Sequence, residues 1–229
     1  MGFNEKTHAF IAASFYKYLL NELGEKGKQA FIHATIYYGS QRGRRMAQRA
    51  IRDGRKLDFA AYMEYGEWVS SEEMANLGET NKTEITSFSP DYTMKISRCP
   101  WHQKFVEMGL KDGGELYCSY IDRSIAQGFN PDIKYLVPQT LYNFDCCIQK
   151  VENAGIKEGE EHPKKLCYVK DFSYHTAHAF FAYKETVCAI FGSDGEKICQ
   201  SVLCDFKKAY GQHMLDELLS FESTNFNIC

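Results

Sequence analysis

The sequence predicts an α+β fold in which a small antiparallel sheet is flanked by N- and C-terminal helical hairpins. Apolar segments ended by glycine lie near both ends of the chain, and β-branched and aromatic residues gather between them. A chain of 229 residues, 44% hydrophobic and 25% charged, is long enough for one substantial core. We therefore expect residues 1–229 to form a single domain.

Each end of the chain has the pattern of a helix that stops at a glycine. The segment "HAFIAASFYKYLL", residues 8–20, is followed by Gly24, and "TAHAFFAYKETVCAI", residues 176–190, is followed by Gly192. Glycine at this place is typical of a left-handed helix cap. A second helical segment follows each glycine, so both ends are predicted to form helical hairpins.

The two hairpins share a pattern displaced by 168 residues, which suggests an internal duplication. We expect the hairpins to pack together about an approximate twofold axis. The later glycine of each copy is expected inside the second helix, where a missing side chain is useful only for close packing. The repeated residues are Gly24, Gly27, Gly43 and Met46 in the first copy and Gly192, Gly195, Gly211 and Met214 in the second.

The middle of the chain changes from helical to strand-like patterns. Residues 57–75 have helical periodicity, and residues 83–100 have a strand-turn-strand pattern around Ser-Pro-Asp. Two helices should follow, over 101–110 and from 113 to the "GFNP" stop, because the residue before a proline avoids helical geometry. Two more strands around a bend at Pro138 complete the sheet, and residues 153–166 form a polar loop.

Composition excludes several classes of protein. The formal net charge of −3 gives no broad basic field, so nucleic acid is not expected as a partner. No run approaches the ~18 apolar residues of a membrane span, and the amino terminus lacks the unbroken apolar run of a signal peptide. We therefore expect a cytoplasmic protein without membrane contact, whose nine cysteines are reduced thiols. The absence of a CxxC pair argues against a zinc finger.

The candidate chemistry lies in the central segment. Cys118 and Asp122 are four residues apart, a spacing that places both on one face of a helix. Cys99 precedes the proline that begins a helix, and Cys146 and Cys147 are neighbours in a predicted strand, where only one of them can face a given pocket. We expect Cys99, Cys118 and one of the two strand cysteines to share a reduced, internal pocket.

The same segment resembles a known family. Residues 98–149 contain a Cys-Pro step, a Tyr-Cys followed by an aspartate, a Phe-Asn-Pro and a later cysteine in a strand. They look like the core of the L-2-amino-thiazoline-4-carboxylic acid hydrolase family, and "DFSYHTAHAFFAY" and "FGSDGEKI" near the carboxyl end are also similar to it. The resemblance implies hydrolytic opening of a thiazoline ring at its amidine carbon, which gives S-carbamoyl cysteine.

Such a reaction needs a nucleophile, an acid for the departing nitrogen and a cation for the substrate carboxylate. Cys118 could attack as a thiolate, or Asp122 could deprotonate a water, and we expect Cys118 to be the nucleophile. His175 and His178 share one face of a predicted helix at i and i+3, and a nearby histidine would lower the pKa of the thiol. These four residues are the predicted catalytic group.

Substrate binding is expected from residues that flank this group. Arg98 and Arg123 are the candidates for holding a carboxylate, since a guanidinium binds it bidentately, with Cys99 and Cys146 beside them. The basic run "RGRRMAQRAIRDGRK", residues 42–56, is interpreted as a solvated helix face, with Arg42 of further interest because it flanks Gly43 of the first hairpin.

Two alternatives stay open at the level of sequence. The histidines with Cys118, Cys146 or Asp122 could hold zinc or another divalent metal, whose open position would activate water. The pocket could also belong to a non-catalytic sensor of a small ligand, with the helical hairpins mediating dimerisation. A small-molecule substrate and a possible homo-oligomer are the expected partners.

Overall fold

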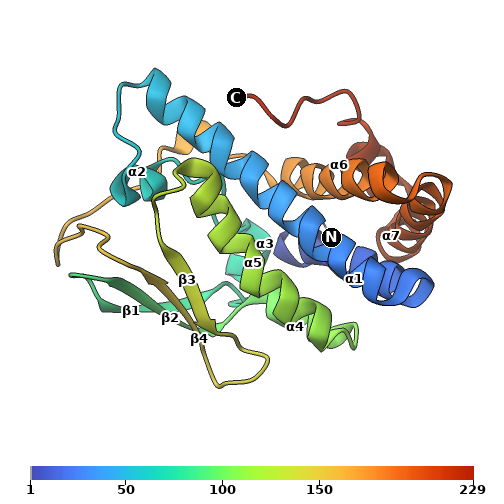
Figure 1. Ribbon diagram of the computed structural model, residues 1–229, viewed down its shortest axis with the longest axis horizontal. Helices are drawn as coiled ribbons and strands as arrows, with labels where there is room; N and C mark the ends of the chain where they lie inside the picture. Colours follow the sequence, from blue (N-terminus) through green and yellow to red (C-terminus); the bar gives the residue numbers. More distant parts are fainter. Residues whose placement is uncertain (1) are drawn as a thin grey trace.

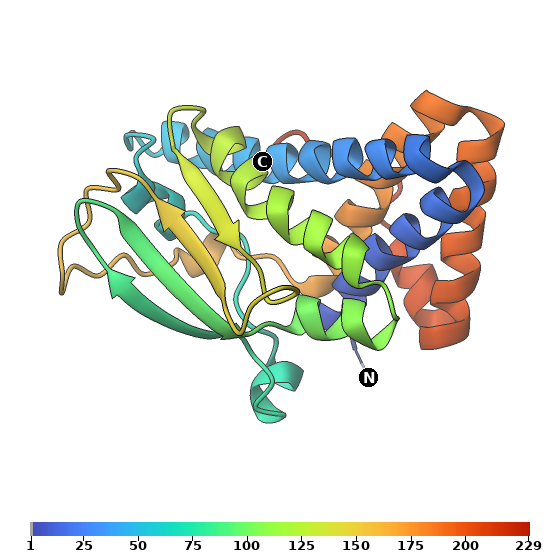
Figure 2. The ribbon, with the colours of Figure 1, turned by 60° about the horizontal axis from the view of Figure 1, so that its bottom comes forward.

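The computed structural model describes residues 2–229 and confirms an α+β fold with a four-stranded antiparallel sheet. Figure 1 shows the sheet on one side, helices α1 and α5 across the middle, and the hairpin of α6 and α7 on the other side. Figure 2 shows the same order, with α5 facing the sheet. The C-terminal hairpin therefore packs mainly on α1 rather than on the sheet, as the contacts between α1 and both of its helices also indicate.

Helix α1, Glu5–Arg52, is the long element that joins the layers. It begins with a capping box, in which the Asn4 side chain accepts from the backbone N–H of Thr7 and the Thr7 hydroxyl accepts from the backbone of Asn4. Gly24 interrupts it with a φ of 56° and a ψ of −131°, a conformation that favours glycine. The first expected hairpin is therefore present, as two helical segments joined at Gly24.

The second hairpin repeats this turn. Helix α6, Phe172–Phe191, ends at Gly192 with a φ of 56° and a ψ of −125°, and α7, Ser193–Leu219, follows directly. A Cβ atom at Gly27 would overlap the Leu19 carbonyl, and one at Gly195 would overlap the Val187 carbonyl. Leu19 and Val187 are themselves 168 residues apart, so the two turns agree in both backbone angle and contact.

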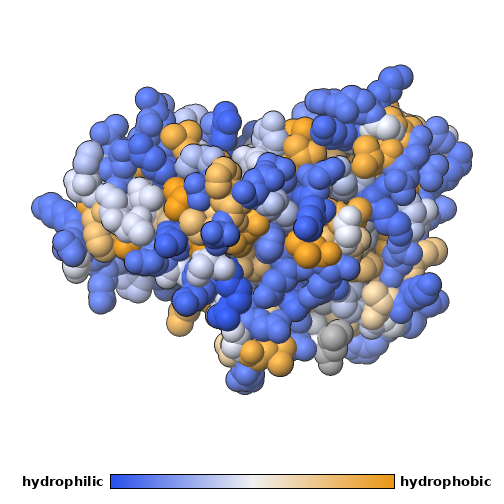
Figure 3. Space-filling view, turned by 90° about the horizontal axis from the view of Figure 1, so that it is seen from below, coloured by the Kyte–Doolittle hydropathy of each residue, from blue (hydrophilic) through white to orange (hydrophobic). Residues whose placement is uncertain are grey.

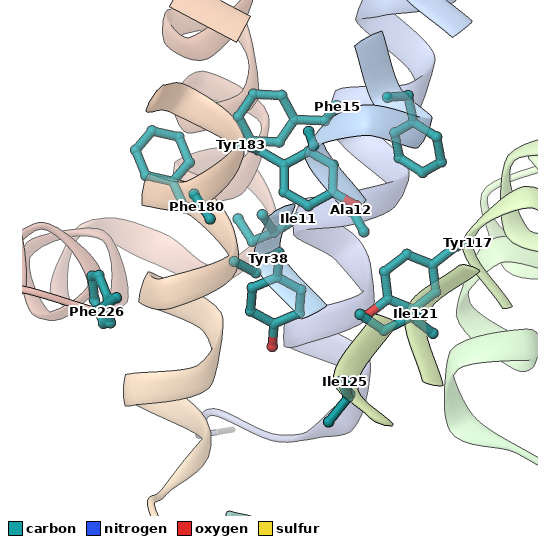
Figure 4. Packing of buried hydrophobic residues seen from close by; sticks show 14 of the residues in the cluster. Ile11, Ala12, Phe15, Tyr38, Tyr117, Ile121, Ile125, Phe180, Tyr183 and Phe226 are labelled. Atoms are coloured by element: carbon teal, nitrogen blue, oxygen red, sulfur yellow. The ribbon is translucent and has the colours of Figure 1, made fainter. Parts of the chain in front are cut away.

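Two residues related by the same displacement touch in the core. Phe15 and Tyr183 have ring centroids 5.1 Å apart, and Figure 4 shows them together where α1 meets α6. Contact between equivalent positions is what a twofold axis through the pair would produce. The packing therefore supports the predicted axis, although the later glycines differ. Gly43 lies inside α1 against the backbone of Ile125, whereas Gly211 breaks α7 with a φ of 87°.

The sheet has the strand order β1-β2-β4-β3, with every neighbouring pair antiparallel. The predicted strand-turn-strand is confirmed, but Pro138 lies within β3 rather than at a bend between strands. It is tolerated because β3 is an edge strand whose pairing with β4 shifts register between Leu136 and Gln139. The strands are β1, Lys82–Ser87; β2, Tyr92–Arg98; β3, Tyr135–Gln139; and β4, Cys147–Val151.

The helical pattern over 57–75 forms two short helices instead of one. Helix α2, Phe59–Glu64, and helix α3, Glu72–Asn76, are separated by a segment without regular structure. Glu67 lies in that segment and is completely buried, with a carboxylate that contacts arginines of α1. The irregular segment therefore places the Glu67 carboxylate against Arg45 and Arg49 of α1. Local periodicity does not predict such a long-range contact.

Helices α4, Pro100–Glu107, and α5, Lys111–Phe129, confirm the last part of the predicted pattern. Helix α5 ends before Asn130 and Pro131, as expected. It packs closely on α1, because Gly39 and Gly43 of α1 leave no room for a Cβ against its backbone. A short 3-10 helix, Leu166–Tyr168, follows the polar loop and leads into α6.

Within residues 2–229, no helix is long and apolar enough to cross a membrane. Figure 3 shows a face on which hydrophilic residues predominate and apolar residues form small separate patches. The buried apolar residues instead form one cluster that includes side chains from α1, α5, α6 and α7. Figure 4 shows Tyr38, Ile121 and Phe180 of this cluster.

Candidate active site

A cavity of about 470 Å³ lies between the sheet and α5 and is closed by parts of α1, α4 and the loops around them. Most of its wall is aromatic or aliphatic, and a few polar groups converge on it, which is the usual composition of a small-molecule site. Its polar and thiol-bearing residues are Arg42, Glu67, Asn81, Thr83, Cys99, His102, Cys118, Asp122, Thr140, Cys147, Gln149, His162 and Lys164.

The structure brings the predicted thiols together. Cys99 at the start of α4, Cys118 on α5 and Cys147 at the start of β4 all line the cavity. Cys146 does not line it, and its sulfur lies 3.2 Å from the amide nitrogen of Gln139. The pocket-facing strand cysteine is therefore Cys147 rather than Cys146, because neighbouring strand residues point to opposite faces.

The three thiols are held in their neutral form. Burial raises the pKa of Cys99 to about 11 and that of Cys147 to about 12. Burial, followed by the neighbouring Cys99 and Asp122, raises the pKa of Cys118 well above its ordinary value. Since the thiolate is the nucleophilic form, this environment disfavours an attacking cysteine at neutral pH.

Asp122 lies one turn after Cys118 on α5 and is held by a short hydrogen-bond chain. The Gln149 amide donates to Asp122 Oδ2 at 2.7 Å, and the Tyr135 hydroxyl donates to Gln149 Oε1 at 2.6 Å. Burial raises the pKa of Asp122 to about 6, against the opposing effects of Arg42 and the Gln149 hydrogen bond. A carboxylate with a pKa near the working pH suits a general base.

Three arginines of α1 surround one carboxylate, that of Glu67, which also lines the cavity. Arg45 makes a bidentate contact to Glu67, with Nε–Oε1 at 3.0 Å and Nη2–Oε2 at 2.7 Å, and Arg49 Nη1 lies 2.7 Å from Oε1. Burial would raise the pKa of Glu67, but Arg45 and Arg42 hold it at about 2. The basic run is therefore a solvated face only in part, because Arg42, Arg45 and Arg49 are buried whereas other basic residues of the run, such as Arg44 and Arg52, are exposed.

Arg42 is the arginine of this group that lines the cavity. Its Nε lies 3.8 Å from Glu67 Oε2, too far for a hydrogen bond, and has no hydrogen-bond partner among residues 2–229. Its guanidinium lies over the Tyr38 ring, 5.7 Å from the centroid. Three guanidinium groups share one carboxylate, so the cluster has excess positive charge, and Arg42 presents it to the cavity.

The predicted catalytic histidines lie outside the cavity wall. His175 donates from Nε2 to the Glu67 carbonyl at 3.0 Å, and His178 donates from Nε2 to Gln41 Oε1 at 2.9 Å. Burial, followed by nearby arginines, lowers the pKa of His175 to about 3 and that of His178 well below its ordinary value. The structure does not bring either histidine to Cys118 or Asp122, so they are neutral groups of the core.

A third buried histidine supports the cavity wall. The Trp101 indole donates to His8 Nδ1 at 2.8 Å, so His8 carries its proton on Nε2 and donates to the Tyr38 hydroxyl at 2.7 Å. Trp101 lines the cavity, and Tyr38 lies under Arg42. This chain of hydrogen bonds therefore positions two parts of the cavity wall, Trp101 directly and Arg42 through Tyr38. His102, which has no distinguishing motif in the sequence, also lines the cavity, with its ring centroid 4.7 Å from that of Tyr142.

The predicted carboxylate-binding arginines also lie elsewhere. Arg98 donates from Nε to the Thr80 carbonyl at 3.0 Å, and Arg123 is exposed on α5. Neither residue lines the cavity. The arginine that does line it is Arg42. Arg42 stands next to Gly43, whose close packing on α5 brings this part of α1 to the site, and that glycine was the available signal.

The sequence leaves open a metal held by His175 and His178 with Cys118, Cys146 or Asp122. Across residues 2–229, no three side chains of histidine, cysteine, aspartate or glutamate are grouped so that they could hold a metal ion. The histidines proposed as ligands bond instead to Glu67 and Gln41.

Comparison with known proteins shows the family of the chain. Residues 4–147 match the family model described as L-2-amino-thiazoline-4-carboxylic acid hydrolase. The match covers more than half of the chain, so the chain belongs to this family of small-molecule hydrolases. It includes Arg42, Asp122 and the three cavity thiols, whereas His175 and His178 lie beyond it. No curated protein and no solved structure gives a match.

Proposed function

We propose that this protein hydrolyses a ring C–N bond in a cyclic amidine that carries a carboxylate, with a thiazoline as the model substrate. The observation that carries the proposal is the presence of two complementary groups in one cavity. Asp122 has a pKa raised to about 6, and Arg42 has an unpartnered guanidinium nitrogen. One group can move protons and the other can bind an anion.

Arg42 is the proposed site for the substrate carboxylate. A guanidinium offers two parallel N–H groups to a carboxylate, and its attraction is strong where water is excluded. The nearest acid, Glu67, is already shared with Arg45 and Arg49, so it leaves Arg42 incompletely neutralised. An anionic ligand would complete the charge balance of this wall.

Asp122 is the proposed general base and then the general acid. It takes a proton from water as the water oxygen bonds to the amidine carbon, and it passes this proton to the ring nitrogen. It then moves the proton of the new hydroxyl to the same nitrogen. The carbon–oxygen double bond forms, the ring C–N bond breaks and the nitrogen leaves as an amine. One water is consumed, and no oxidant or reductant is needed.

The Gln149 amide keeps Asp122 oriented for this work. Its hydrogen bond occupies Oδ2, and the described residues donate no hydrogen bond to Oδ1. The free oxygen can therefore accept from a water in the cavity. Cys118 lies beside it as a neutral thiol, which in this mechanism shapes the cavity and does not attack.

Turnover of 2-amino-thiazoline-4-carboxylate by the purified protein and two variants tests the proposal. Asp122→Asn should lower kcat by about 10²–10⁴-fold, the usual contribution of a positioned acid-base group. Cys118→Ser should stay within about tenfold of the unmodified protein, because a thiolate is not required. Asp132→Asn, an exposed aspartate after α5, is the matched control and should have no effect.

The reverse result would assign a different mechanism. A loss of activity in Cys118→Ser, with a covalent adduct on Cys118 seen by mass spectrometry, would show that the thiol is the nucleophile. Binding of the carboxylate ligand without turnover would instead favour the sensor alternative. In that case Asp122→Asn should change affinity only modestly, whereas Arg42→Met should abolish binding.

A further inference from the structure

The cavity is larger than the model substrate requires. Its volume of about 470 Å³ lies within the range of about 300–1,000 Å³ that is typical of sites for drug-sized ligands. Along α5 its wall extends from Tyr117 to Ile125, which is about 12 Å at 1.5 Å per residue. A single five-membered ring with an amino group and a carboxylate fills only part of this length.

The reacting ring should occupy the part of the cavity near Arg42. Gly39 and Gly43, on either side of Arg42 in sequence, approach the α5 backbone at Ile121 and Ile125. Arg42 therefore enters the cavity beside the second half of the α5 wall, where Asp122 also lies. The first half of that wall, around Cys118, is left for another part of the ligand.

This remaining end, which we call the thiol pocket, consists of Cys99, Cys118, Cys147, His102 and Tyr142. Its thiols are neutral, and a neutral thiol packs as a small polarizable apolar group. Burial also lowers the pKa of His102, so its ring is uncharged at neutral pH.

The aromatic part of the thiol pocket adds a geometric preference. The rings of His102 and Tyr142 meet at 4.7 Å and 63°, an edge-to-face arrangement. The five residues of the pocket thus combine polarizable sulfur with ring edges and are themselves uncharged, and Asp122 borders them at the reacting end. These surfaces favour a flat apolar group over a polar or ionic one.

We propose that the preferred substrate carries, beside the carboxylate-bearing ring, an uncharged group of aryl size that packs in the thiol pocket. This inference rests on the proposed function for the position of the ring. It adds the substrate class that the cavity selects, and it gives the three thiols a role in specificity.

Binding of ring analogues that cannot be opened tests the inference on the unmodified protein. The probes are 2-aminothiazole-4-carboxylate and two phenyl derivatives of it, substituted at ring carbon 5 or on the amino nitrogen. Isothermal titration calorimetry should show at least one phenyl derivative binding about 30-fold more tightly than the parent, as expected for burial of a phenyl group. Equal or weaker binding of both derivatives would overturn the inference.

A filled pocket gives a second test. In Cys118→Leu the larger side chain should remove the advantage of the phenyl derivative, so that the affinity ratio falls at least tenfold. Cys204→Leu makes the same change at an exposed position on α7 and should keep the ratio of the unmodified protein. An unchanged ratio in Cys118→Leu would place the phenyl group elsewhere and contradict the proposal.

The tests separate this inference from the proposed function. Turnover of the small thiazoline with no preference for phenyl derivatives would leave the function in place and remove the inference. If the small thiazoline is not turned over, tight binding of a phenyl derivative would still support the thiol pocket, and the proposed reaction alone would be lost. The ligand comparison needs no variant, so it decides the question even if Cys118→Leu does not fold.

Discussion

Asp122 and Glu67 are two carboxylates on one cavity, and the structure treats them in opposite ways. Burial raises the pKa of Asp122 to about 6, and among residues 2–229 its side chain accepts a hydrogen bond from Gln149 alone. Glu67 is more deeply buried, yet the guanidinium groups of Arg45 and Arg42 hold its pKa at about 2. The number of cationic partners, rather than burial, decides which carboxylate can exchange a proton near neutral pH.

This difference assigns a separate task to each acid. Glu67 stays ionised and fixes the arginines of α1, including the side chain that faces the cavity. Asp122 remains free to bind and release a proton. Pairs of acids whose pKa values are driven apart by their surroundings are typical of acid-base sites.

The largest effect is expected from neutralising Glu67. Glu67→Gln leaves three buried guanidinium groups without their anion and should lower the free energy of unfolding by about 3–5 kcal/mol. Chemical denaturation at pH 7 measures this loss. Because the pKa of Glu67 is lowered on folding, its contribution is complete above pH 4.5 and is lost as the pH falls towards 2. The gap between the two proteins should therefore narrow in acid.

Glu64→Gln is the matched control for this change. Glu64 pairs with Arg55, whose side chain is 42% exposed, at 2.9 Å. A pair of this kind typically contributes about 0–1 kcal/mol. Equal destabilisation by the two substitutions would mean that the buried arginines are not held by Glu67.

Neutralising Asp122 should have the opposite sign. Its folded pKa of about 6 exceeds the ordinary 3.8, so the charged form destabilises the folded state as the pH rises through this interval. Asp122→Asn should therefore raise the free energy of unfolding by about 1–3 kcal/mol at pH 8 and change it little below pH 3.8. Thermal unfolding at several pH values measures the difference, and a destabilised variant at pH 8 would contradict the assigned environment.

A smaller effect is expected from the amide that holds Asp122. With the proposed substrate, kcat/KM should rise with pH because the base must be deprotonated. This ascending limb of the pH profile should have an apparent pKa of about 6. Gln149→Met removes a donor that favours the charged carboxylate, so the limb should move up by about half a unit to one unit. Gln139→Met, which alters a glutamine that bonds to Cys146 outside the cavity, should leave the limb in place.

The sequence predicted much of the α5 wall because local geometry determines it. Helical spacing put Cys118 and Asp122 on one face, and strand alternation limited the pocket to one of Cys146 and Cys147. Both rules depend only on nearby residues. The α+β class followed in the same way, from glycine-ended helices and a strand-turn-strand pattern.

The arginine wall could not be predicted in the same way. Arg42 and Arg45 belong to a basic helical run that resembles a solvent-exposed face in the sequence. Their burial depends on Glu67, which lies more than twenty residues away in an irregular segment. His175 and His178 share the expected helix face, but that face contacts the Glu67 carbonyl and Gln41 rather than the thiols. Periodicity predicts a shared face and does not predict which neighbour covers it.

The hydrogen bonds of the buried histidines have a spectroscopic consequence. His8, His175 and His178 each carry the proton on Nε2, since each faces a fixed donor or acceptor. Their imidazole ¹⁵N resonances should therefore show a single tautomer and remain unchanged across neutral pH. His8 also accepts from the Trp101 indole at the cavity wall. That indole proton is consequently a natural NMR reporter of cavity occupancy, and it requires no label on the ligand.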